Sequence, residues 1–223
     1  MMQALFTEIV KGDIQKVRAR IEKDPSVLNM VASGSPKKYA GQSPLQVAIR
    51  SEQLEIAALL LQRGADPNFI EEYDANSPGG SWAAPVLHDA VMLAVRRSRW
   101  LRPVTFGRPV TEWKMVGSQA GADESFAIME ALLDAGADPN ALDSYGNSVL
   151  GRAALDARQI LPKRENAEGR PVNSELHRDL SRIFEALRSR GADVGRVEPN
   201  LGMSLPDYYA QEPVVAFITG EAA

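Results

Sequence analysis

Residues 41–68 read GQSPLQVAIRSEQLEIAALLLQRGADPN, a stretch with the pattern of two short helices followed by a turn. Ser43 is a suitable N-cap, and Pro44 suits the first helical position because proline has no N–H to leave unpaired there. Apolar residues recur at helical spacing over 54–60, and Gly64 then ends the second helix as a left-handed residue. Such a pair is too small to bury its own apolar face, so it must stack on similar units.

The closing letters of this stretch recur along the chain. GADPN stands at residues 64–68 and again at 136–140, and a weaker copy, GADVG, stands at 191–195. Each copy follows a leucine-containing helical stretch, so the glycine is expected to end the helix and the residues after it to shape a turn. The repeated letters are therefore interpreted as structural markers and not as a ligand motif.

Residues 41–68 closely resemble the ankyrin repeat, whose pattern is roughly G-x-T-P-L-H-x-A, two helices and a G-A-D-x-N exit. Leu45 precedes Gly64 by 19 residues, as the equivalent leucine and glycine do in that family. Gly136 precedes Leu150 by 14 residues, which also matches the family. The resemblance implies a stack of helix-turn-helix units.

The remaining intervals are longer than in the family. In PVLHDA, Leu87 takes the position of the family's leucine, and the interval from Gly64 to Leu87 is about 9 residues longer than in the family. The intervals from Leu87 to Gly136 and from Leu150 to Gly191 are stretched by about 30 and about 22 residues. The last two insertions fall between paired helices, so we expect them to emerge side by side at one end of the stack.

Gln46 and Gly151 replace the family's histidine, which only His88 retains. In the family this histidine bonds locally and holds the entry turn, so the resemblance gives His88 a structural role. Its loss at the other two positions predicts less regular turns there.

The predicted fold class is all-α: an ankyrin-like helical solenoid of about five helix-turn-helix units with projecting finger loops and two long inter-helix insertions. One domain, 1–223, is expected. Its predicted parts are an N-terminal cap (1–30), repeats (41–68, 82–140 and 146–195), a C-terminal cap (202–220) and insertions (about 96–124 and 158–174).

The first insertion contains RRSRWLRPVTFGRPVTEWK, with six basic residues and one acid between Arg96 and Lys114. The whole chain, by contrast, has a net charge of −4. Arginine with tryptophan is typical of interaction hot spots. Trp100 and Trp113 either contact a partner or pin the insertion to the scaffold. The doubled RPVT could fold back as a β-hairpin.

The second insertion is mixed in charge, and we expect two prolonged helices joined by a polar loop near 162–173. Asn173 or Ser174 could cap the returning helix, and His177 is expected to be a solvated helix residue. The long finger before Leu87 carries acidic and aromatic residues that would suit a basic partner.

No catalytic or cofactor motif is present: there is no G-x-S-x-G, H-E-x-x-H, EF-hand loop, P-loop or dinucleotide fingerprint. The chain has no cysteine and two histidines, which disfavours disulfides and metal sites. The prediction is therefore a non-enzymatic chain with no catalytic residues, no metal and no cofactor. The lack of a signal-peptide pattern and of an uninterrupted apolar run predicts a cytoplasmic chain with no membrane contact.

The resemblance implies a protein-protein interaction module, and we expect one dedicated protein partner and a chain that is monomeric when free. An inhibitor or immunity protein is the preferred role. The alternatives are an adaptor or regulatory scaffold, and nucleic-acid binding through the basic and aromatic residues of 96–114. The predicted partner contacts are Lys37, Lys38, Tyr39, Arg50, Ser51, Tyr73, Asp74, Trp82, Met92, Arg99, Trp100, Arg102, Arg108, Trp113, Ser144, Tyr145, Leu155 and Asp156.

Overall fold

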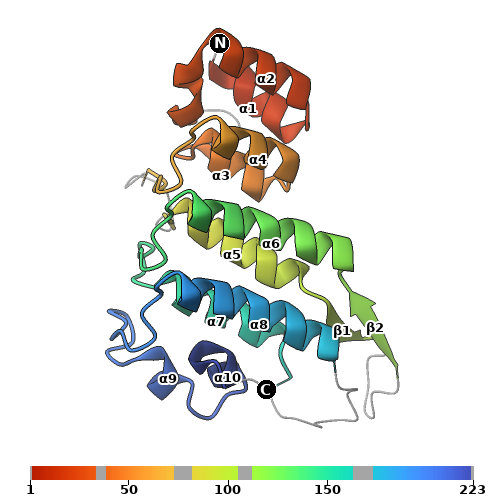
Figure 1. Ribbon diagram of the computed structural model, residues 1–223, viewed down its shortest axis with the longest axis vertical. Helices are drawn as coiled ribbons and strands as arrows, with labels where there is room; N and C mark the ends of the chain where they lie inside the picture. The colour runs from red at the N-terminus through yellow and green to blue at the C-terminus, as the bar shows by residue number, and fades with distance from the viewer. Residues whose placement is uncertain (1, 34–38, 73–81, 105–111, 163–172, 222–223) are drawn as a thin grey trace.

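A computed structural model describes residues 2–33, 39–72, 82–104, 112–162 and 173–221 (Figure 1). Ten α-helices are found in these ranges, together with one 3-10 helix and two strands. The helices are α1 (Met2–Val10), α2 (Ile14–Lys23), α3 (Pro44–Arg50), α4 (Leu54–Gln62), α5 (Val86–Arg97), α6 (Gln119–Asp134), α7 (Val149–Ile160), α8 (Ser174–Ser189), α9 (Leu205–Tyr208) and α10 (Val214–Thr219). The 3-10 helix is Pro25–Asn29, and the strands are β1 (Trp100–Pro103) and β2 (Trp113–Val116).

Consecutive helices lie as pairs, and the pairs follow one another from the N-terminal end to the C-terminal end (Figure 1). The α3/α4, α5/α6 and α7/α8 pairs each form a layer, and α1/α2 and α9/α10 lie at the two ends. The prediction of a mostly helical chain is confirmed. The prediction of an all-α class is wrong in one respect, because β1 and β2 form a small antiparallel sheet.

The core is built from residues that recur at the same place in each pair. Leu45, Leu87 and Leu150 are at most 1% exposed, and each is the second residue of the first helix in its pair. In the second helices, Leu60 and Leu132 lie four residues before the exit glycines and are completely buried. Burial of one such side chain stabilises the fold by about 1.5–3 kcal/mol.

The helix ends follow the predicted turn chemistry. Gly64, Gly136 and Gly191 all have φ of +91°, a left-handed conformation that side chains with a Cβ rarely adopt. At the helix starts, the side chains of Ser43 and Ser148 accept bonds from backbone N–H groups three residues on. The exit glycines and the Ser43 cap were predicted, and both are confirmed.

The exit turns bond to one another across neighbouring pairs. The side chain of Asn68 donates to Gly136 O and accepts from Asp138 N at 2.9 and 2.8 Å. Asn140 repeats both bonds one pair further on, with Gly191 O at 2.8 Å and the next exit turn's Asp193 N at 2.8 Å. The last letter of GADPN therefore holds the turn that follows it in the stack.

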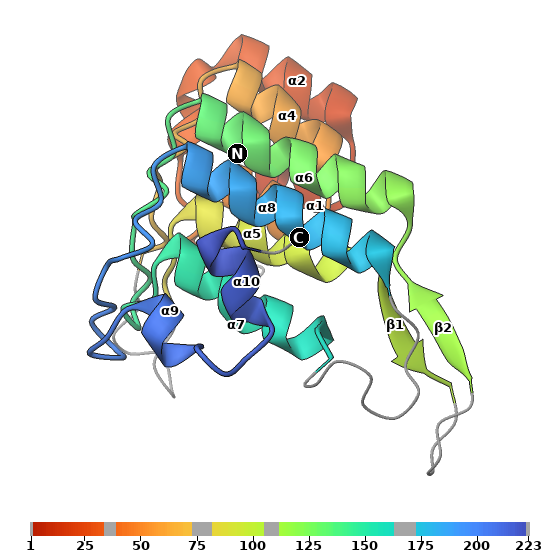
Figure 2. The same ribbon diagram turned by 60° about the horizontal axis from the view of Figure 1, so that its bottom comes forward.

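A hairpin is present in the first insertion, as predicted, but its strands do not coincide with the doubled RPVT: β1 ends at Pro103 of the first copy, and the second copy lies outside the described residues. β1 pairs with β2 in the register Trp100↔Val116, Leu101↔Met115, Arg102↔Lys114 and Pro103↔Trp113. Figure 2 shows the two strands leaving the helical body beside the N-terminal end of α6, away from the loops that join successive pairs. In the second insertion, Asn173 caps α8 by accepting from Leu176 N, as one of the two predicted capping residues.

Candidate functional site

Three connecting loops lie on one side of the molecule, between α4 and α5, α6 and α7, and α8 and α9 (Figure 1). We call them the finger loops. Each loop is closed by one isolated antiparallel β-bridge. The three bridges join Ile70 to Pro85, Leu142 to Ser148 and Val197 to Ser204. The ribbon therefore presents a row of similar loops along one edge of the stack.

Neighbouring finger loops are tied together by hydrogen bonds. Ser144 N donates to Ala83 O at 2.8 Å, and Ala83 N donates to Ser144 Oγ at 3.0 Å. The indole N–H of Trp82 donates to Asp143 Oδ2 at 2.9 Å in the same neighbouring loop. Because these bonds already fix the loops, a partner would not need to order the bonded residues on binding.

Trp82, one of the predicted contacts, lies half-buried next to two guanidinium groups. The Cζ atoms of Arg50 and Arg152 lie 5.4 and 5.2 Å from its ring centroid, within the range of cation–π attraction. The indole therefore links α3, a finger loop and α7. Its hydrogen bond also helps to hold the pKa of Asp143 below its ordinary value, against the effect of burial.

Arg50, another predicted contact, is committed within the molecule. Its Nε donates to Asp89 Oδ1 at 2.8 Å, and its two terminal nitrogens donate to the Glu71 carboxylate at 3.1 and 2.8 Å. Burial raises the pKa of the Asp89 carboxyl, and Arg50 and Gln46 oppose that rise. Arg50 therefore stabilises the finger loop through Glu71, and its guanidinium is already used in bonds within the molecule.

The predicted contacts on the first helices are less exposed than expected. Met92 and Leu155 are half-buried, and Asp156 is half-buried with an ion pair to Arg152 at 3.2 Å. Burial raises the pKa of Asp156, while Arg152 opposes the rise. Ser51 places its Oγ 2.6 Å from its own helix's Val47 O.

His88 has the structural role that was predicted, but its bond joins two repeats. Its Nε2 lies 3.1 Å from Asn147 O, just before the next entry serine, so this nitrogen carries the proton. Gln46 makes the equivalent bond, because its Nε2 donates at 2.9 Å to Ala84 O, just before Pro85. The prediction of less regular turns where the histidine is missing is therefore wrong at Gln46, since an amide N–H replaces the ring N–H.

At the third position, Gly151 leaves space that a carboxylate occupies. Glu198 Oε2 accepts a 2.8 Å bond from Ser148 N, and it lies 3.3 Å from the position that a Cβ of Gly151 would take. The entry turn is again tied to the following unit, so the expected irregularity is absent here as well.

The finger loops expose large apolar side chains, and sequence reasoning missed three of them, Ile70, Val197 and Met203. Ile70, Tyr145, Val197 and Met203 are 55%, 59%, 62% and 43% exposed. We call these four residues the finger surface. Ile70 and Val197 each stand six residues after an exit glycine, so aligning the repeats on that glycine would have revealed the shared position. Tyr145 was predicted as a contact, and its neighbour Ser144 is exposed as well.

The root of the first insertion is built into the helical body. Arg99 donates from Nε and a terminal nitrogen to both oxygens of Asp179 in α8, at 2.9 and 2.8 Å, and its backbone N–H adds a third bond. Asn173 Nδ2 donates to Arg99 O at 3.1 Å, so the roots of the two insertions are in contact. Arg99 was predicted to face a partner, but its buried guanidinium is used to fix the hairpin.

The other predicted residues of this insertion divide into packed and exposed ones. Trp100 is half-buried and packs against the core, which favours the pinning interpretation for that ring. Trp113 is also half-buried, whereas Arg102 is exposed. Tyr39, before the first full repeat, is buried at 5% exposure and cannot offer its ring to a partner.

Five predicted contacts lie outside the residues that the structure describes. They are Lys37, Lys38, Tyr73, Asp74 and Arg108. By sequence alone, Tyr73 stands nine residues after Gly64, as Tyr145 does after Gly136.

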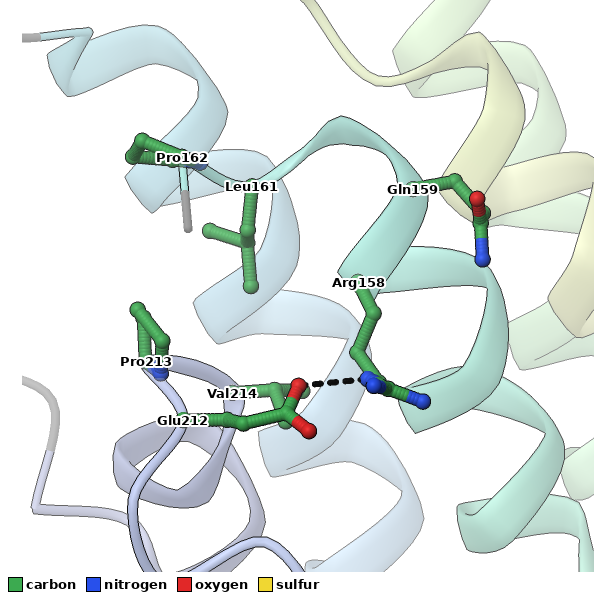
Figure 3. Close-up of a pocket in the computed structure, with 7 residues that line it drawn as sticks. All are labelled: Arg158, Gln159, Leu161, Pro162, Glu212, Pro213 and Val214. Atoms are coloured by element: carbon green, nitrogen blue, oxygen red, sulfur yellow. Dashed lines mark hydrogen bonds and ion pairs between the residues drawn. The ribbon is translucent and has the colours of Figure 1, made fainter. Parts of the chain in front are cut away.

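A pocket of about 340 Å³ lies between the end of α7 and the start of α10 (Figure 3). Leu161, Pro162, Pro213 and Val214 line it together with the ion pair of Arg158 and Glu212, 2.5 Å apart. The guanidinium of Arg158 also lies 5.1 Å from the ring centroid of Tyr209. These interactions join the C-terminal pair to α7, so we interpret the charged groups of the pocket as packing contacts.

Two further searches covered only the residues with described positions. No group of three or more histidine, aspartate and glutamate side chains there could hold a metal ion. None of the helices there is both long and apolar enough to cross a membrane.

Comparison with models of protein families identifies an ankyrin repeat in the chain. The family model of the ankyrin repeat matches residues 40–71, which include α3, α4 and the first exit turn. No curated protein matches the chain. The matched stretch is the one whose spacing, proline start and glycine exit carry the resemblance, so residues 40–71 form an ankyrin repeat.

Proposed function

We propose that the chain is a non-enzymatic protein-binding module that holds one dedicated protein partner on its finger surface. Ankyrin repeats are typically interaction modules, which supports the general class. The observation that carries the proposal is the exposure of Ile70, Tyr145 and Val197 on successive finger loops along one edge.

Scattered exposed apolar residues are ordinary, but these recur on structurally equivalent loops. Removing such side chains from water would contribute about 25 cal/mol for each Å² of apolar surface that a partner covers. The bonds between Ala83 and Ser144 limit the conformational entropy that these loops would lose on binding.

The proposal also covers the domain organisation, the oligomeric state, the location and the effect of binding on the partner. The helix pairs would form one solenoid domain, monomeric when free and located in the cytoplasm. Binding would block the partner, as an inhibitor or immunity protein does, and the alternative is an adaptor that recruits it. A single dedicated partner is favoured because the insertions interrupt the regular repeat and give this surface features of its own.

Affinity capture with a matched pair of variants tests the proposal. Ile70→Ser combined with Val197→Ser removes apolar surface from two finger loops without touching the core. Val104→Ser makes a similar change at the hairpin, where the side chain is 48% exposed. The proposal expects one dominant protein to be recovered with the unaltered chain and the control, and to be lost with the double variant. Recovery of that protein by all three chains would contradict it.

A further inference from the structure

The hairpin places two positive side chains directly opposite each other. Arg102 and Lys114 are cross-strand partners in the β1–β2 register, and both are exposed. No ion pair joins either of them to another residue of the described part of the chain. Like charges at directly opposite positions destabilise a two-stranded sheet, so this pair would be stabilised by a negative group from outside.

The hydrogen-bond pattern also identifies an available strand edge. Val104 N donates to Glu112 O at 3.0 Å, so Val104 and Glu112 form a hydrogen-bonded cross-strand pair. Because pairs alternate in an antiparallel ladder, Arg102 and Lys114 are also hydrogen-bonded to each other, whereas Met115 directs its N–H and C=O away from β1. The outer edge of β1 has no donor at Pro103. The edge of β2 is therefore the one suited to pairing.

The hairpin is held in position before any partner arrives. The Arg99–Asp179 ion pair fixes its first strand, and Gly117, with φ of +84°, turns the chain from β2 toward α6. A Cβ at Gly117 would lie 2.9 Å from Ser98 O, so the turn requires glycine. A two-stranded sheet alone is marginally stable, and a third strand would complete it.

We propose that the edge of β2 binds an extended acidic segment of a protein, which pairs with Met115 as a third strand. Its carboxylates would lie beside Arg102 and Lys114 on one face of the sheet, and its apolar side chains would cover the exposed Met115 on the other face. This mode combines main-chain hydrogen bonds for affinity with side-chain charge for selectivity. The site is separate from the finger surface and does not depend on it.

Several contacts favour an acidic protein strand over nucleic acid. Arg97 is near Glu52 and Glu124, and Arg99 is bound to Asp179, so two of the region's arginines already have carboxylate partners. Stacking on bases requires an open aromatic face, but Trp100 packs against the core.

A short fluorescent peptide of alternating valine and glutamate is a direct probe, measured by anisotropy with the full chain. The matched probes are the same peptide with lysine in place of glutamate, the valine–glutamate peptide with N-methyl groups on alternate backbone nitrogens, and single-stranded oligothymidine. We expect the valine–glutamate peptide to bind, and the lysine and N-methylated peptides to bind at least about tenfold more weakly.

Variants of the chain test the main-chain bonds of Met115 and the charges of Arg102 and Lys114. Met115→Pro removes the outward N–H and leaves the bonds between β1 and β2 in place, whereas Met115→Leu keeps that N–H. We expect about tenfold weaker peptide binding for Met115→Pro, little change for Met115→Leu, and loss of binding when Arg102→Glu and Lys114→Glu are combined. The finger variants Ile70→Ser and Val197→Ser should leave peptide binding unchanged.

Three results would overturn the inference. The first is no anisotropy change with the valine–glutamate peptide up to about 1 mM, a concentration that corresponds to about 4 kcal/mol of binding free energy. The second is tighter binding of oligothymidine than of the peptide, which would assign the surface to nucleic acid. The third is equal binding of the N-methylated peptide, which would exclude pairing at the strand edge even if Met115→Pro failed to fold.

Discussion

The side chain of Asn68 brackets the exit turn of the next repeat, with its amide nitrogen on Gly136 O and its amide oxygen on Asp138 N. Asn140 does the same one repeat later. An asparagine can do this because its amide offers a donor and an acceptor side by side. The GADPN motif thus ends one repeat and orients the turn of the following one.

Asn68→Ala should lower the free energy of unfolding by about 1 kcal/mol, since two hydrogen bonds are lost at an exposed site where water replaces them in part. Asn68→Asp keeps the acceptor for Asp138 N but loses the donor to Gly136 O. The free energy of unfolding of this variant should lie between those of the unaltered chain and Asn68→Ala. Urea denaturation of the three chains measures the difference. An Asn68→Ala chain as stable as the unaltered one would show that the ladder does not contribute to stability.

Asp179→Ala should destabilise the chain by about 3 kcal/mol, because it leaves the Arg99 guanidinium without its carboxylate. The matched control is Asp123→Ala, which breaks an ion pair with Arg182 at a half-exposed carboxylate and should cost less than about 1 kcal/mol. Thermal melting gives the stability of both variants.

Asp179→Ala should also speed amide hydrogen exchange across β1 and β2, since it releases the root of the hairpin. Unchanged exchange in both strands would contradict the anchoring role that we assign to Arg99.

His88 should make stability depend on pH. Burial lowers the pKa of its ring below the ordinary value of 6.5, so the unfolded chain binds a proton at a higher pH than the folded chain does. Stability is therefore fully present above about pH 6.5 and is lost as the pH falls toward the folded pKa. The slope of the free energy of unfolding is at most about 1.4 kcal/mol per pH unit in that window.

His88→Gln tests this interpretation, because Gln46 already makes the equivalent bond with an amide. The variant should keep the fold and have a smaller loss of stability between pH 7 and 5, measured by denaturation at a series of pH values. The same pH dependence in both chains would assign the effect to other groups.

The fold was predictable where the determining interactions are local. Ser43 caps its own helix and Gly64 ends the next one, so a few neighbouring residues contain the information. The interval between Leu45 and Gly64 then identified the repeat. The role of Gln46 was missed because the prediction considered only its own turn, whereas its bond reaches Ala84 in the next unit.

The candidate contacts were less predictable because long-range pairing decides which charged groups are available. Arg99 lies 80 residues from Asp179 in sequence, and nothing near Arg99 indicates that pairing. Arg50 is likewise claimed by Asp89, 39 residues away. The exposure of Ile70 and Val197 follows from how the finger loops lie on the stack, so it became visible only with the structure.

The most direct test of the central claim is the dissociation constant between the full chain and the protein recovered by capture, measured by titration calorimetry. The account predicts that Ile70→Ser with Val197→Ser weakens binding by at least about 100-fold, or nearly 3 kcal/mol, with an unchanged melting temperature. Val104→Ser should leave the constant unchanged. An unchanged constant for the double variant would contradict the assignment of the binding site to the finger surface.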